Sequence, residues 1–260
     1  MAVASAWALI DRPLLLAMLA LAVMWLAAAA GAHLRGRHAE IEERLRQELN
    51  IVLTASLTML GLLVGFTFSM AASRYDLRKS YEEAEANAIG TEYLRVGLLA
   101  TSETQQARAL LRRYLDQRIL FYTLRAPREL DRLGDDTTRL QNALWEVVQG
   151  PAERQQTNIT GLVASGMNDV INMQGWVQAV WWNRIPGSAW LLMLAIGACS
   201  NALFGFNTLQ PETRLRRLGV LPLIVAIAFF LIADIESPRH GAIHVVPQNL
   251  IALSHALVVQ

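Results

Sequence analysis

The side chains best suited to metal or acid–base chemistry are few in this sequence and poorly grouped. His240 and His244 stand four residues apart, the spacing of paired metal ligands on one helix face. Pro238 and Gly241 oppose a helix there, and no third ligand lies nearby in the sequence. The chain has no phosphate-binding loop, dinucleotide fingerprint, nucleophile elbow or Cys-x-x-Cys pair. The sequence therefore predicts no enzyme, no metal site and no cofactor.

A second candidate group consists of three carboxylates that follow a long apolar run, namely Glu82, Glu83 and Glu85. Two interpretations are open. The group is either the solvated face of a helix or a ring of carboxylates formed when several copies of that helix surround one axis.

Composition points to a membrane protein. Apolar residues make up 53% of the chain, and the mean hydropathy is +0.29, above the range of ordinary soluble domains. The net charge of +1 argues against a nucleic-acid partner, which requires a strongly basic face. The single cysteine, Cys199, lies in an apolar run and excludes an intramolecular disulfide.

Four apolar stretches are long enough to cross a bilayer, which takes about 20 residues. They predict an all-α membrane protein with a helical soluble domain inserted between the second and third spans. The predicted parts are a first hairpin over 1–72 with spans 13–32 and 51–72, a soluble domain over 73–187, a second hairpin over 188–233 with spans 188–206 and 218–233, and a tail over 234–260.

The second span carries two distinct faces. Thr54, Thr58, Gly61 and Gly65 share one face, and the two glycines form a small-xxx-small pair suited to close helix packing. The adjacent face repeats the spacing with larger apolar residues: Ala55, Met59, Leu62 and Phe66. Either the small face packs on a neighbouring helix while the apolar face meets lipid, or several copies surround an axis and the apolar face forms a neck.

Helices separated by short breaks are expected in the soluble region. One begins near Ser102; a loop follows over 125–134; a second helix runs from Asp135 or Asp136 to Gly150-Pro151, and a third runs over 152–182. A short helix is expected from Gln248, and only 242–246 has a strand-like pattern. Four tryptophans near the third span suggest an interfacial belt or packing against a neighbouring helix: Trp176, Trp181, Trp182 and Trp190.

The orientation of the spans is not settled by charge. The two short loops opposite the soluble region carry seven arginines: Arg35, Arg37, Arg44, Arg46, Arg214, Arg216 and Arg217. The flanks on the other side carry six basic residues: Arg12, Arg74, Arg78, Lys79, Arg184 and Arg239. The short-loop rule alone would place the soluble region outside the cell, by a margin of one residue.

Three blocks resemble a known family. They are SRYDLRKSYEEAEANAIGTEYLR over 73–95, MNDVIN leading to RIPGSAWLL over 167–192, and ADIESPRHG over 233–241. On these blocks the chain is identified as a member of the bacterial bestrophin-like domain family of membrane proteins. The Gly65-Phe66 pair and the Ser73-Arg74-Tyr75 run more remotely resemble bestrophin channels.

The resemblance implies a homopentameric ion channel of the bacterial inner membrane, whose partners are its own copies, the lipid bilayer and inorganic ions. It implies that the second helix lines the pore and that the termini and residues 73–187 are cytoplasmic. Carried over by position, the neck residues are Leu62 and Phe66, with Thr58 and Met59 beside them. Arg74, Tyr75 and Arg78 would brace adjacent helices at the end of the span.

The sequence departs from the family in two places. The polar Thr58 occupies a neck position that is large and apolar in bestrophins, and the tail has no counterpart of the acidic calcium clasp of animal bestrophins. A non-conducting membrane scaffold or stress sensor, whose soluble helices bind a partner, is therefore the alternative function.

Overall fold

The computed structural model describes residues 11–37, 43–208 and 214–258. Parts of the two predicted short loops between the spans, residues 38–42 and 209–213, lie outside these residues. The chain divides into two compact units: a membrane unit, Met1–Arg74 with Arg184–His244, and a helical unit, Tyr75–Asn183 with Val245–Gln260. The segment predicted as one tail over 234–260 is thus shared between the units.

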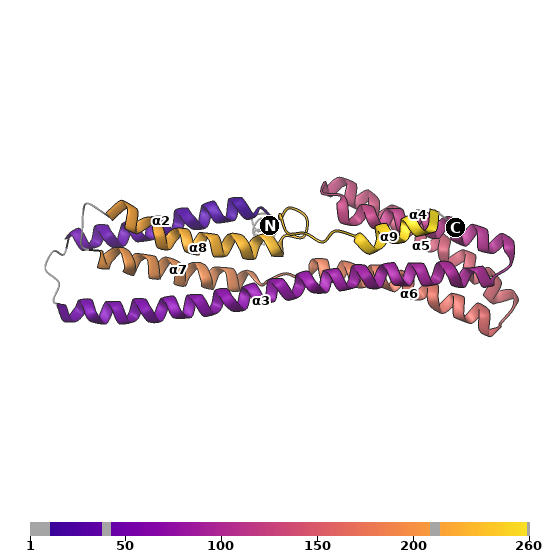
Figure 1. Cartoon of the computed structure of the whole chain (residues 1–260), viewed down its shortest axis with the longest axis horizontal. Coiled ribbons are helices and arrows are strands. Elements are labelled where there is room, and N and C mark those ends of the chain that lie inside the picture. The colour runs from indigo at the N-terminus through magenta and orange to yellow at the C-terminus, as the bar shows by residue number, and fades with distance from the viewer. Residues whose placement is uncertain (1–10, 38–42, 209–213, 259–260) are drawn as a thin grey trace. The chain divides into compact units, whose positions relative to one another are not determined.

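The membrane unit contains α2 (Pro13–Arg37), the first part of α3 (Glu43–Arg95), α7 (Gly187–Asn207) and α8 (Arg214–Glu236) (Figure 1). Four helices in the described part of the chain are long and apolar enough to cross a membrane. They include the four predicted spans, and no strand occurs among the described residues. The predicted all-α membrane architecture is confirmed.

Two glycines allow α2 and α7 to touch through their backbones. A Cβ atom on Gly31 would lie 1.9 Å from the carbonyl oxygen of Ala202, and one on Gly205 would lie 1.9 Å from that of Ala28. No side chain fits at either position without separating the helices. In the membrane, where apolar side chains gain nothing by leaving lipid, such close approach is a main source of helix association.

A single helix of 53 residues, α3, runs through both units. Its sequence contains no proline, so the helical hydrogen bonds continue from the apolar run into the charged segment without a break. The helix ends in a 3-10 turn, η1 (Val96–Leu98).

The helical unit packs the second part of α3 with α4 (Thr101–Thr123), α5 (Pro127–Arg154), α6 (Asn158–Trp182) and α9 (Gln248–Val258). Its core is one cluster of buried apolar residues drawn from all five helices, with Ile89, Leu111, Leu144, Val163 and Leu250 fully buried.

Three of the predicted boundaries in this unit are wrong. The segment expected as a loop over 125–134 is mostly helical, because α5 begins at Pro127, a first-turn position that proline tolerates. The helix continues past Gly150-Pro151 to Arg154. The next helix begins at Asn158 rather than 152, because Thr157 caps it and exchanges hydrogen bonds with Thr160.

The four tryptophans divide between the two interpretations. Trp176 and Trp182 are 55% and 72% exposed, as an interfacial belt requires. Trp181 and Trp190 are buried: Trp181 stacks edge-on with Phe121 and Tyr122, and Trp190 with Phe229. The last two therefore serve packing.

Candidate functional site: the exposed faces of α3

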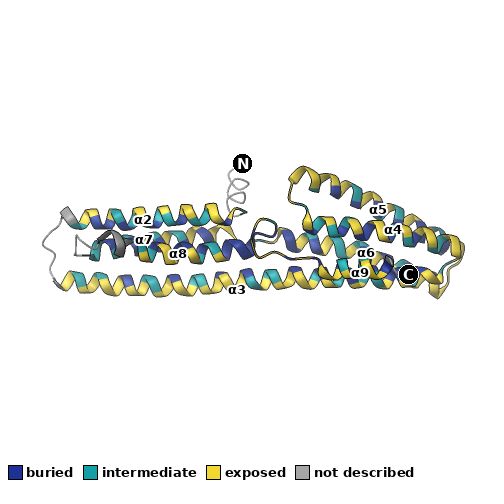
Figure 2. Cartoon of the chain, turned by 45° about the horizontal axis from the view of Figure 1, so that its top comes forward, coloured by how far each residue is buried: buried dark blue, intermediate teal, exposed yellow. Residues whose placement is uncertain are grey.

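Most of the apolar part of α3 is exposed in the single chain (Figure 2). Among residues 51–72, burial is confined to Leu53, Leu60, Thr67 and Ala71. The predicted neck residues Met59, Leu62 and Phe66 are 51%, 57% and 61% exposed. A helix that leaves this much apolar surface uncovered must meet lipid or other copies of the chain.

The small-residue face is exposed as well. A Cβ atom on Gly61 or Gly65 would meet no heavy atom within 4 Å, in contrast to Gly31 and Gly205. Within one chain this glycine pair therefore packs against nothing. The predicted packing role of this face stays a prediction, and it requires a second chain.

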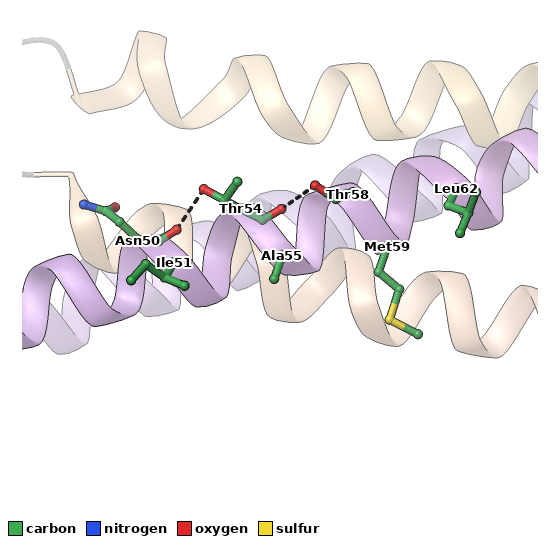
Figure 3. A pocket seen from close by; sticks show the side chains of 7 residues that line it. All are labelled: Asn50, Ile51, Thr54, Ala55, Thr58, Met59 and Leu62. Atoms are coloured by element: carbon green, nitrogen blue, oxygen red, sulfur yellow. Dashed lines mark hydrogen bonds between the residues drawn. The ribbon is translucent and has the colours of Figure 1, made fainter.

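The two threonines of this face satisfy their hydroxyl groups within the helix. Thr54 donates to the carbonyl oxygen of Asn50 and Thr58 to that of Thr54, both at 2.9 Å (Figure 3). This bonding lowers the cost of a hydroxyl group at membrane depth. Each hydroxyl oxygen keeps a lone pair that can accept a hydrogen bond or contact a cation.

An open hollow of about 720 Å³ runs along this part of α3. The seven residues that line it come from both faces of the helix: Asn50, Ile51, Thr54, Ala55, Thr58, Met59 and Leu62 (Figure 3). The lining is mostly apolar with two hydroxyl groups and one carboxamide, and it contains no charged side chain. Such a surface can border a water-filled path without binding an ion tightly.

The three residues predicted to brace adjacent helices lie where the apolar run ends. Arg74 Nη1 lies 3.6 Å from Glu236 Oε1 at the end of α8, inside the membrane unit. Tyr75 is half-buried and packs against the core of the helical unit. Arg78 is fully buried.

The predicted carboxylate ring does not fit the burial of its members. Glu82 is buried and accepts hydrogen bonds from the backbone N–H groups of Asn249 and Leu250 at 2.9 and 3.0 Å, capping the N-terminus of α9. Glu85 is buried in an ion pair with Arg118. Only Glu83 is exposed. Helix capping and core pairing hold Glu82 and Glu85 inside the fold, so of the three carboxylates only that of Glu83 is available to a ring, and the ring itself stays a prediction.

The Glu85–Arg118 pair belongs to a polar cluster in the core of the helical unit. Tyr122 donates to Glu85 Oε2 at 3.3 Å. Burial raises the pKa of Tyr114 to about 12 and raises that of Tyr122 above its usual range. Both phenols therefore stay protonated at neutral pH, and the Tyr122 hydroxyl group can donate its hydrogen bond to Glu85.

The polar contacts at the end of α8 were not predicted. Asp234 accepts the backbone N–H groups of Ala242 and Ile243 at 2.7 and 2.9 Å, and Glu236 accepts that of Ile185 at 2.7 Å. In the sequence, Asp234 and Glu236 indicate only where the apolar span ends.

The histidine pair does not lie on one helix face, because His240 and His244 lie outside any helix. Among the described residues, no group of three or more His, Cys, Asp or Glu side chains could hold a metal ion.

The fold and this surface define an all-α membrane protein with four spanning helices and a helical unit whose sequence lies mostly between the second and third spans. A family model for the bestrophin-like domain matches residues 14–250. The chain therefore belongs to the bestrophin-like family.

Solved structures share the fold at low sequence identity. A point variant of a bacterial bestrophin homologue from Klebsiella pneumoniae aligns with a TM-score of 0.64 and 12% identity over 95% of this chain and 98% of that chain. A second structure of the Klebsiella homologue gives 0.63 and 13% over 92% and 97%. A variant described as a membrane protein gives 0.63 and 13% over 92% and 98%. No curated protein matches this chain significantly.

Proposed function

We propose that this protein is a homopentameric ion channel of the bacterial inner membrane, with the apolar half of α3 lining the pore. Leu62 and Phe66 form a hydrophobic neck, with Thr58 and Met59 beside it. The termini and the helical unit are cytoplasmic. The observation that carries this proposal is the exposure, within one chain, of both the apolar and the small-residue face of α3.

The two faces suit two different contacts in such an assembly. Gly61 and Gly65 have open space beside them, so the backbones of adjacent copies of α3 can approach closely. The neighbouring face then points toward the axis, where a ring of Leu62 and Phe66 side chains narrows the path. A narrow apolar constriction expels water and opposes ion passage until it widens.

Ion flux from liposomes tests this proposal directly. The purified protein is reconstituted, and gradients of potassium, sodium and chloride are imposed in turn. We expect flux in the wild-type protein and a rise of several-fold in Leu62→Ala and Phe66→Ala, because a smaller side chain widens the neck. Leu191→Ala is the matched control: Leu191 is 67% exposed on α7, a helix to which we assign no pore role, so its flux should equal that of wild type.

Two results would count against the proposal. Wild-type flux that neither neck variant changes would remove these residues from the path. No flux from any variant, with correct insertion verified, would favour the alternative of a non-conducting scaffold or stress sensor and direct the search to partners of residues 73–187.

A further inference from the structure

Glu236, the last residue of α8, joins three segments of the membrane unit. Its side chain is fully buried, and a buried carboxylate is costly unless it is paired. Its Oε1 atom accepts the backbone N–H of Ile185 at 2.7 Å, in the link between α6 and α7. The same oxygen lies 3.6 Å from Arg74 Nη1 on α3.

The end of α8 that carries this carboxylate is bonded to the segment that follows it. At the same end of α8, Asp234 accepts two backbone N–H groups of the following segment, at Ala242 and Ile243. That segment lies so close that a Cβ atom on Gly241 would be 2.2 Å from the Asp234 carbonyl oxygen. Glu236 therefore presents its charge from a fixed position.

Among the described residues, polar contacts join α3 to the rest of the membrane unit at both ends of its apolar run. At one end Asn207 Nδ2 donates to Asn50 Oδ1 at 3.0 Å, in an exposed position. At the other end stands the Arg74–Glu236 pair, with side chains only 15% and 0% exposed. The contact at Arg74 joins two charged groups that are shielded from solvent, whereas the contact at Asn50 joins two neutral amides in an exposed position.

We propose that Glu236 is the positioning residue of the pore helix: through Arg74, its carboxylate fixes the place of α3 relative to α8 and to the link before α7. This inference rests on the proposed pore role of α3. Leu62 and Phe66 precede Arg74 by 12 and 8 residues, or about 18 and 12 Å along a helix. Since α3 is continuous over this distance, a shift at Arg74 moves the neck.

The variants that test this proposal separate charge from hydrogen bonding. Glu236→Gln keeps an oxygen that can accept the Ile185 N–H but loses the charge that attracts Arg74. Arg74→Met removes the other partner, and Arg74→Gln, which loses the charge but stays polar, replaces it if the methionine variant fails to insert. Asp11→Asn is the control, because Asp11 pairs with Arg184 at 2.6 Å in the same unit and this pair includes no residue of α3.

Two readouts are measured on each full-length variant in liposomes. The first is ion flux. The second is the distance distribution between spin labels on Ser69→Cys in different copies of the chain, made in a Cys199→Ser background because Cys199 is the only native cysteine. Ser69 is exposed on α3, five residues before Arg74.

We expect flux to rise about five-fold or more in Glu236→Gln and in the Arg74 variant. A factor of about five lies at the lower end of the effects that coupling between two sites typically produces. The flux of the double variant should rise no further, the distributions of label distances should broaden in all three variants, and Asp11→Asn should match wild type.

Fluxes and distances that stay at wild-type values, or effects of the two substitutions on flux that multiply, would overturn the proposal. If wild type carries no ions but the distances still broaden, the channel function fails and the positioning role stands. If wild type conducts and neither variant differs from it, the positioning role fails and the channel function stands.

Discussion

The crossing of α2 and α7 offers the sharpest test of the packing argument. Gly31→Ala adds one methyl group at a point where its carbon would lie 1.9 Å from the carbonyl oxygen of Ala202. Ordinary contact begins at 3.4 Å, so the two backbones must move apart by about 1.5 Å. That separation also loosens the reciprocal contact of Gly205 with Ala28, because both lie in the same crossing.

The cost follows from two opposing terms. Overpacking a close contact costs about 1–3 kcal/mol, and alanine recovers up to about 1 kcal/mol over glycine through helix propensity. We expect a net loss of about 1–2 kcal/mol. For a chain of this length, that loss lowers the midpoint of thermal unfolding by about 2–8 °C.

The assay is thermal unfolding in detergent, followed by intrinsic fluorescence. Gly219→Ala is the matched control: it lies in α8 of the same unit, and its Cβ atom would meet nothing within 4 Å. Only the propensity term acts there, so its unfolding midpoint should stay level or rise. A Gly31→Ala midpoint equal to or above that of Gly219→Ala would refute the backbone contact between α2 and α7.

Three further predictions concern the helical unit. Because burial raises the pKa of Tyr114 to about 12 from 10, the folded chain keeps a proton that the unfolded chain loses, so stability should fall as pH rises above about 10; tyrosinate absorbance should show this phenol ionising only on unfolding. Arg118→Met strands its buried partner carboxylate and should cost about 3–5 kcal/mol in denaturant unfolding, whereas Arg139→Met breaks an exposed pair and should cost under about 1 kcal/mol; equal losses would contradict the difference in burial. Glu82→Ala removes the acceptor for the first amides of α9 and should speed their hydrogen exchange, while Glu83→Ala at an exposed site should leave them unchanged.

The membrane architecture follows from local features of the sequence. A span is recognised by the length of its apolar run, which is a local property, and all four predicted spans lie within observed helices. The uninterrupted course of α3 is also compatible with the sequence, because residues 43–95 contain no proline. The start of α5 at Pro127 and the start of α6 after Thr157 were harder to predict. A proline in a first turn and a threonine cap act as helix signals only for a particular path of the backbone.

The partner of each polar or small residue was decided only by the tertiary structure. The sequence pattern singles out Gly61 and Gly65 for close packing, yet within the chain it is Gly31 that has a backbone opposite it, while Gly61 has open space. Glu82, Glu83 and Glu85 form one acidic run, yet α9 and α4 bury two of them, supplying backbone amides for one and the Arg118 guanidinium for the other. Glu236 ends an apolar span like any charged residue, and only the fold brings Arg74 and Ile185 to it. These contacts join residues that are far apart in the chain. A local pattern of residue types does not indicate which distant residue will pack against a given side chain.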